Sequence, residues 1–187
     1  NLFDDRARER SAAFPFELAY RLISMFSLKG DTILDPFLGI GTTLAAAVTA
    51  ARNSIGYEID KNLGEIILSN YSELVDFSNR RITARLKNHL EFIEQRSQKT
   101  GRFRYTNKHY RFPVMTNQEI DLIINELKSL TKTGPNAYAA VYGDGPQDPF
   151  VTDPAQAALP ASEKNGLRQS SSANRQKRNH QQQPLFK

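Results

Sequence analysis

The residues whose types and spacing are best suited to chemistry form one string, Asp35-Pro36-Phe37-Leu38-Gly39-Ile40-Gly41-Thr42-Thr43. An apolar segment ends in a carboxylate, and two glycines then let a ligand approach the backbone closely. The unpaired N–H groups and positive dipole end of a helix beginning there would favour an anionic group, while Asp35 can accept a hydrogen bond from an ammonium. The string therefore predicts a site for a zwitterionic amino-acid group, whereas a dinucleotide would want Gly-x-Gly-x-x-Gly. The alternative is a tight turn that binds nothing.

A second carboxylate, Glu58, follows the next apolar segment, 23 residues after Asp35. An acidic residue about 20 residues past a glycine turn is placed to bind both hydroxyls of a ribose. The two carboxylates together predict a nucleoside ligand with an amino-acid-like arm; the alternative for Glu58 is a solvated strand end. Phe14 and Pro15, which precede the first predicted helix, form either an apolar wall beside the ligand or a simple hydrophobic staple and helix start.

Hydrophobic periodicity predicts alternating helices and strands around these residues. Pro15 opens a helix with an apolar face at helical spacing, and later segments alternate between the two patterns. The order of helix, strand, helix, strand, helix, strand predicts a parallel sheet with crossover helices. Thr116 and Glu119 have capping-box spacing and predict one more helix. The apolar face of the first helix consists of Leu18, Leu22, Met25 and Phe26. The three predicted strands are residues 32–35, 54–59 and 82–86. The apolar stripe of the last helix consists of Ile120, Ile123, Ile124 and Leu127.

Composition limits the class of protein. The 187 residues carry a net charge of +5, which fits a polyanionic partner. The chain has no cysteine, so it has neither disulfides nor thiolate metal ligands. It shows no membrane-length apolar run and no signal peptide, and we expect a cytoplasmic protein. Beyond Gly134, Pro, Gly, Ser, Asn and Gln dominate, which predicts a disordered tail.

Three strings together resemble a known family: Phe14-Pro15-x-x-Leu18, then Asp35 to Thr43, then Gly56-Tyr57-Glu58-Ile59. They resemble the amino-group (N-4/N-6) DNA methyltransferases of restriction–modification systems, in particular the permuted group whose catalytic block precedes its cofactor block. The likeness spans about residues 7–92. It implies an α/β fold with a partial doubly wound, Rossmann-like parallel sheet, and S-adenosylmethionine as cofactor. It also implies that Asp35, Phe37, Gly39 and Gly41 line the methionine end, that Glu58 holds the ribose and that Ile59 lies near the adenine.

The sequence departs from this family at the catalytic residues. The family's catalytic tetrapeptide contains Pro-Pro followed by an aromatic residue, and no Pro-Pro pair occurs in the 187 residues. The nearest string, Asp148-Pro149-Phe150, is not expected to be catalytic. No catalytic residue and no metal ligand is therefore predicted here, and the catalytic and target-recognition half is expected upstream of Phe14 or on a separate chain that completes the sheet. The alternatives are a non-catalytic cofactor-binding subunit or remnant, and an enzyme that methylates RNA or protein.

Two further segments suggest macromolecular partners. Residues 96–112 are basic without an acidic residue and carry interleaved aromatic side chains. They predict phosphate contacts to double-stranded DNA, with stacking on an unpaired base, or else a solvated hairpin or loop. The candidate DNA-binding residues are Arg102, Arg104, Lys108 and Arg111. The terminal Gln182, Leu185 and Phe186 resemble peptides that bind bacterial replication sliding clamps.

The domain organisation that follows has three parts. Residues 1–92 form the cofactor-binding part of the methyltransferase domain. Residues 93–133 form a basic, aromatic segment with a helix, and residues 134–187 form the tail.

Overall fold

The computed structural model describes residues 14–100 and 103–151. Its elements in chain order are α2 (Phe16–Phe26), β1 (Thr32–Asp35), α3 (Thr42–Thr49), β2 (Asn53–Gly56), α4 (Lys61–Thr100), β3 (Tyr105–Thr106), β4 (Pro113–Val114), the 3-10 turn η1 (Asn117–Glu119), β5 (Leu127–Gly134), β6 (Ala137–Tyr142) and the 3-10 turn η2 (Asp148–Phe150). The described residues divide into two compact units, one formed by residues 14–88 and 123–150 and the other by residues 89–100, 103–122 and 151. The predicted boundaries at 92 and 133 differ from this division, since the first unit takes up the β5–β6 segment.

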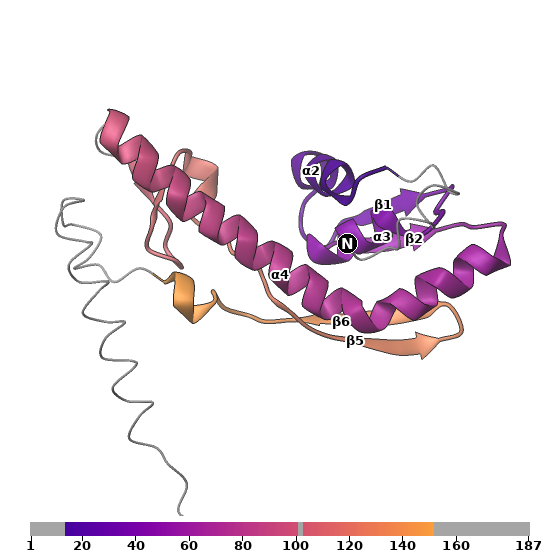
Figure 1. Cartoon of the computed structure of the whole chain (residues 1–187). Helices are drawn as coiled ribbons and strands as arrows, with labels where there is room; N and C mark the ends of the chain where they lie inside the picture. Colours follow the sequence, from indigo (N-terminus) through magenta and orange to yellow (C-terminus); the bar gives the residue numbers. More distant parts are fainter. Residues whose placement is uncertain (1–13, 101–102, 152–187) are drawn as a thin grey trace, which may run out of the picture. The chain divides into compact units, whose positions relative to one another are not determined.

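The first unit contains, after α2, a strand–helix–strand arrangement in which β1 and β2 pair in parallel (Figure 1). The register joins Thr32 to Asn53 and Asp35 to Gly56, so both strands end at the same edge of the sheet. The predicted α/β class with a parallel sheet is therefore confirmed. One face of the sheet carries Ile33, which packs against an apolar cluster formed by α2 and by the alanines of and just after α3.

The other face of this sheet carries exposed apolar side chains. Leu34 of β1 is 61% exposed and Ile55 of β2 is 51% exposed. Parallel sheets are normally covered on both faces. The predicted helix at α2 is confirmed, and the side that it buries carries Ala19, Tyr20 and Ile23. Its larger apolar residues face outward: Leu18, Leu22, Met25 and Phe26.

The predicted third strand at 82–86 is wrong, because α4 runs as one helix of 40 residues through that segment. Its buried positions repeat every four residues, at Leu74, Ser78, Ile82 and Leu86. A spacing of four places side chains on one helical face. Within the part of the chain that the structure describes, the parallel sheet has two strands.

The predicted helix at 116–127 and the predicted tail from 134 are also corrected. The capping box of Thr116 and Glu119 exists, but it closes only the short turn η1. Residues 127–142 form the antiparallel hairpin β5–β6, in which Gly134 pairs with Ala137 across a Pro-Asn turn. The predicted disorder of residues 152–187 lies outside the described residues.

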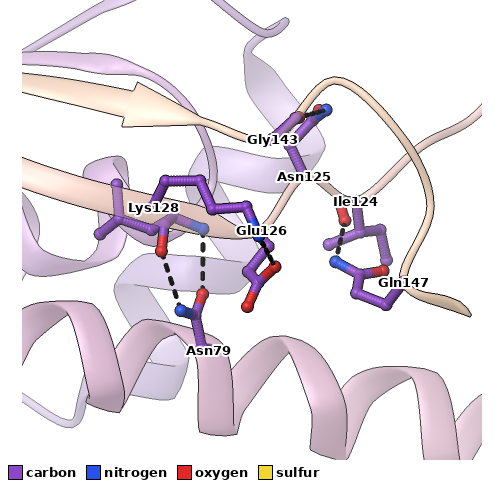
Figure 2. Close-up of polar contacts among 8 residues, drawn as sticks. Asn79, Ile124, Asn125, Glu126, Lys128, Gly143 and Gln147 are labelled. Carbon is purple, nitrogen blue, oxygen red and sulfur yellow. Dashed lines mark hydrogen bonds and ion pairs between the residues drawn. The ribbon is translucent and has the colours of Figure 1, made fainter. Parts of the chain in front are cut away.

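The hairpin packs on α4 through apolar and polar contacts (Figure 1). Leu127 joins the core cluster that contains Ile40, Val48 and Leu74. The rings of Tyr71 and Tyr138 stack, with centroids 3.8 Å apart. Figure 2 shows the Asn79 amide reaching from α4 to the β5 backbone, where it donates to the Leu127 carbonyl at 2.8 Å and accepts from the Leu127 N–H at 2.9 Å.

The same close-up shows how the base of the hairpin is closed (Figure 2). Asn125 donates to the Gly143 carbonyl at 2.6 Å, and the Gly143 N–H donates to the Glu126 carbonyl at 2.8 Å. Gln147 donates to the Ile124 carbonyl at 2.8 Å. The segment after β6 is thereby held by side-chain amides as well as by the ladder.

The second unit is organised around a buried asparagine. Asn107 is 1% exposed, and its amide nitrogen donates to the carbonyls of Glu119 and Leu122 at 2.7 and 2.8 Å. Its amide oxygen accepts from the N–H groups of His109 and Tyr110 at 2.9 and 2.8 Å. One side chain thus fixes both the β3–β4 turn and the segment after η1.

Candidate functional site

The candidate site lies at the edge where β1 and β2 end. Asp35 closes β1, and one of its carboxylate oxygens accepts from the Phe37 N–H at 3.0 Å. The Leu38 N–H donates across to the Tyr57 carbonyl at 2.9 Å, and the Gly41 N–H donates to the Leu38 carbonyl at 2.9 Å. The string predicted from the sequence therefore forms a closed turn that leads directly into α3.

The two glycines of this turn are required by the backbone. Gly39 has φ +57° and Gly41, at the N-cap of α3, has φ +85°. Both angles lie in the left-handed region, which side chains with a Cβ disfavour. A Cβ on Gly41 would also lie 3.2 Å from Cγ1 of Ile67.

Glu58 links this turn to the segment after β2. One carboxylate oxygen accepts from the Gly39 N–H at 2.7 Å, and the other accepts from the Asp60 N–H at 2.8 Å. The structure thus brings Glu58 to the glycine turn across 19 residues of sequence. Asp60 in turn begins α4, since its carboxylate accepts from the Asn62 N–H at 2.9 Å. The sequence reasoning missed this role of Asp60, although an Asp one residue before a helix is a common cap.

Exposed apolar side chains flank the two carboxylates. Phe37 is 88% exposed and Ile59 is 99% exposed, and Pro36 is exposed between Asp35 and Phe37. Thr42, another predicted site residue, is only 4% exposed, and its contact with a cofactor stays a prediction. Its burial follows from its place in the first turn of α3, the helix that carries most of the small-residue core.

Phe14 and Pro15 lie at the start of α2. Pro15 occupies the N-cap position with φ −61°, and its carbonyl accepts from the Leu18 N–H at 3.1 Å. Phe14 is 42% exposed. This confirms the predicted helix start, while the apolar wall beside a ligand stays a prediction.

The basic segment has a different character from the one predicted for base stacking. Tyr110 and Phe112 are buried and stack on each other, with centroids 5.0 Å apart. They serve as core residues of the second unit, so the expectation that these two rings stack on a base is wrong. The charged groups of Arg104, Lys108 and Arg111 belong to exposed residues, whereas Arg102 lies outside the described residues.

Other expectations divide between the described and undescribed parts of the chain. Residues 148–150 form η2, with Phe150 buried. Among residues 14–100 and 103–151, no group of three or more His, Cys, Asp or Glu side chains could hold a metal ion. The helices in those same ranges include none with an 18-residue stretch apolar enough to cross a membrane. Gln182, Leu185 and Phe186 lie beyond the described residues.

The fold and the turn together define an α/β strand–turn–helix site with a carboxylate after the second strand. Residues 3–69 match the profile of the DNA methylase family, N6/N4 type. The resemblance predicted from the sequence is thereby confirmed for this part of the chain.

Characterised relatives agree with this assignment. The type II methyltransferase M.MthZI of Methanothermobacter thermautotrophicus is 44% identical over 135 residues, which are 72% of this chain and 37% of the relative. M.MjaI of Methanocaldococcus jannaschii is 53% identical over 77 residues, or 41% of this chain and 24% of the relative. The chain therefore spans about a quarter to two fifths of the length of these relatives.

A solved structure also matches part of the chain. It is a candidate DNA modification methylase from Thermus thermophilus, crystallised with S-adenosyl-L-methionine. The match covers 38% of each chain at 33% identity, with a TM-score of 0.31.

Proposed function

We propose that this chain forms the cofactor-binding part of a DNA methyltransferase, which transfers a methyl group from S-adenosylmethionine to the exocyclic amino group of adenine or cytosine in double-stranded DNA. The observation that carries the proposal is the Glu58 carboxylate, held between the Gly39 and Asp60 N–H groups at the mouth of the glycine turn. A carboxylate fixed in this way needs no reorganisation before a ligand binds.

The residues present fit the chemical groups of this cofactor. An ionised carboxylate has about four acceptor positions, and the two backbone N–H groups occupy two of those on Glu58. The remaining positions suit the two hydroxyls of a ribose. One oxygen of Asp35 accepts from Phe37, which leaves the other for an ammonium group. The exposed alkyl group of Ile59 suits the flat face of an adenine, and exposed Phe37 lies beside Asp35 at the predicted methionine end.

The chemistry of transfer would be supplied in part from outside these residues. When bound, S-adenosylmethionine provides an electrophilic methyl group on a sulfonium. This chain's own residues would orient the cofactor, which contributes to rate by positioning the reacting groups. The groups that accept the amino protons of the target base belong to the tetrapeptide that is absent from this sequence.

The open surface of the first unit supports a partner that carries the catalytic and target-recognition half. Leu34 and Ile55 are exposed on one sheet face that no described element covers, and Met25 and Phe26 of α2 are 72% and 78% exposed. In the described residues each strand of the two-stranded sheet also has one unpaired edge. We propose that further strands and an apolar surface, on the same polypeptide or another, cover these positions.

A second candidate, a cofactor-binding subunit without activity of its own, is favoured by one observation. The 187 residues contain no Pro-Pro pair and hence no catalytic tetrapeptide of this family. A methylation assay with tritiated cofactor distinguishes the two. Methyl transfer by this chain together with a polypeptide that carries the tetrapeptide would support the methyltransferase, whereas cofactor binding without any transfer in that mixture would support the subunit.

Titration calorimetry with S-adenosylmethionine tests the cofactor site itself. We expect Glu58→Ala to weaken binding at least tenfold, which corresponds to about 1.4 kcal/mol and lies near the lower end expected for hydrogen bonds to a charged group. Glu65→Ala, which removes an exposed carboxylate from the first turns of α4, is the matched control and should bind as the unaltered chain does. A folded Glu58→Ala variant with unchanged affinity would refute the proposed role of Glu58.

A further inference from the structure

The β3–β4 hairpin of the second unit separates its apolar and its cationic side chains. Tyr110, Phe112 and Val114 are at most 5% exposed and form the interior. Arg104, Lys108 and Arg111 are exposed, and residues 103–112 contain no acidic side chain. The cations therefore belong to one short segment whose apolar residues hold it against its own unit. We call these three residues the hairpin cations.

The backbone that carries the hairpin cations is fixed before any ligand binds. The four hydrogen bonds of the Asn107 side chain hold the turn from inside. The Asn107 N–H donates to the Phe112 carbonyl at 2.9 Å, and the Lys108 N–H donates to the Ile120 carbonyl at 2.9 Å. A rigid segment loses less conformational entropy on binding than a flexible loop would.

Two of the hairpin cations have local surroundings that suit contact with an anion. The Arg104 guanidinium lies over the Tyr105 ring, 5.3 Å from its centroid, which orients the group without neutralising it. Arg111 has φ +60°, a region that Asn adopts more readily than most residues, so Asn can replace Arg111 without added backbone strain. Neither arginine has an ion pair among the residues that the structure describes.

The third hairpin cation, Lys108, is engaged in an ion pair within its own unit. Lys108 forms an ion pair with Asp121 at 2.7 Å, and both side chains are about two thirds exposed. An exposed pair of this kind is weak. A phosphate group approaching Lys108 can therefore displace Asp121 at little cost.

We propose that the hairpin cations bind the phosphate backbone of duplex DNA and that Asp121 competes with phosphate for Lys108. The inference rests on the proposed function, because it supplies that enzyme with a DNA contact outside the cofactor site. The burial of Tyr110 and Phe112 favours backbone contact over stacking on bases, and hence a contact that is independent of sequence.

The test is fluorescence anisotropy of the full chain with a labelled duplex of arbitrary sequence, at several salt concentrations. Each phosphate contact contributes a slope of about −0.9 in the logarithm of affinity against the logarithm of salt, which is about eightfold in affinity at 0.1 M relative to 1 M salt. Arg104→Gln and Arg111→Asn should each flatten the slope by about 0.9. Lys132→Gln, which removes a positive charge from exposed β5, is the matched control and should leave the slope unchanged.

Asp121→Asn provides an outcome that misfolding cannot imitate. By releasing Lys108 it should steepen the slope by up to about 0.9 and raise affinity by up to about eightfold at 0.1 M salt. Lys108→Gln should then cost more affinity in the Asp121→Asn chain than in the unaltered chain. Unchanged slopes in Arg104→Gln, Arg111→Asn and Asp121→Asn would overturn the proposal.

Two controls assign any failure to the right hypothesis. A calorimetric titration of the same variants with S-adenosylmethionine should give unchanged affinity, so loss of DNA binding with intact cofactor binding concerns the hairpin alone. Unchanged DNA slopes in variants that still bind the cofactor would refute only the hairpin contact. Polyglutamate binding as tight as duplex binding, with the same response to the variants, would show a surface for acidic proteins and would also overturn it.

Discussion

Replacing Gly41 with alanine tests whether the glycine turn is constrained by backbone conformation alone or also by packing. Gly39 and Gly41 both have positive φ, at +57° and +85°. A Cβ on Gly39 meets nothing closer than 4.0 Å, whereas one on Gly41 lies 3.2 Å from Cγ1 and 3.4 Å from Cγ2 of Ile67. Both substitutions therefore have the cost of placing a Cβ at positive φ, and only Gly41→Ala has the additional cost of crowding Ile67.

The magnitudes follow from these contacts. An alanine in the left-handed region costs about 1–2 kcal/mol, and the reduced entropy of the unfolded chain offsets about 0.4–1 kcal/mol of this. Crowding of Ile67 adds about 1–3 kcal/mol. We expect Gly39→Ala to lower the free energy of unfolding by about 1 kcal/mol and Gly41→Ala by about 3 kcal/mol.

Urea denaturation followed by circular dichroism measures both values, and a double-mutant cycle isolates the packing cost. In an Ile67→Ala background, only the Cβ of residue 67 remains, 3.8 Å from the added methyl group. The cost of Gly41→Ala should then fall to that of Gly39→Ala. Equal costs for the two glycines in the unaltered chain, or no change on trimming Ile67, would show that the contact with Ile67 is not what constrains the turn.

Three further predictions concern stability. Asn79→Ala should lower the free energy of unfolding by about 2–4 kcal/mol, because it leaves the N–H and carbonyl of buried Leu127 unpaired. Urea titration measures this loss, with Asn88→Ala on the exposed face of α4 as the control. Equal losses in the two variants would contradict the reasoning. Burial raises the pKa of Tyr142 to about 12, so the tyrosine ionises at lower pH in the unfolded chain than in the folded one. Its contribution to the free energy of unfolding is therefore full below about pH 10 and is lost as the pH rises to 12. The melting temperature should fall less over that range in Tyr142→Phe than in the unaltered chain, and equal falls would contradict the reasoning. Asn107→Ala removes four hydrogen bonds. It should accelerate hydrogen exchange at the N–H groups of His109 and Tyr110, from which the Asn107 side chain accepts, and leave exchange in α3 unaffected. Unchanged protection of these two N–H groups would exclude a structural role of Asn107.

The part of the fold that the sequence predicts well is the part dictated by local chemistry. The turn after Asp35 needs two residues with positive φ, and glycine is the residue that supplies them at no steric cost. An acidic residue two positions past the end of β2 reaches that turn because parallel strands end at one edge. Residue type and spacing therefore suffice to place Asp35, Gly39 and Glu58 together.

The wrong prediction of a strand at 82–86 comes from a short pattern that is compatible with both a strand and a helix. Ile82, Ala84 and Leu86 alternate like a strand, yet Ile82 and Leu86 are also four residues apart and both 1% exposed on the buried face of α4. A window of five residues cannot separate a period of 2 from half of a helical stripe. The longer series from Leu74 onward is needed for the distinction.

Residues 117–119 form a short turn in place of the predicted helix over 116–127. The reason lies in contacts with residues that are distant in sequence, which a local pattern does not reveal. The carbonyls of Glu119 and Leu122 accept from the Asn107 side chain, and the carbonyl of Ile120 accepts from the Lys108 N–H. These carbonyls are the acceptors that a continuing helix would use. A residue more than ten positions upstream therefore ends the helix after one turn.

The hairpin after residue 127 escapes the sequence prediction for a simpler reason. Gly134 and the Pro-Asn pair that follows are typical of the start of a loop, although here they form the connection between β5 and β6. Tyr138, Ala140 and Tyr142 alternate with exposed residues along β6, which is the pattern of a half-buried strand. The signal is present in the sequence, and the high content of turn residues around it conceals it.

The pairing of β1 with β2 also limits how the gene encoding this segment can change. The register joins Asp35 to Gly56 over strands of only four residues, and each strand alternates between the packed and the open face. Deleting one codon within either strand would exchange the two faces and move the following carboxylate out of reach of the glycine turn. Substitutions at Leu34 or Ile55 leave this geometry intact. In this stretch the number of codons between Asp35 and Glu58 is therefore more tightly constrained than the identity of many residues that they encode.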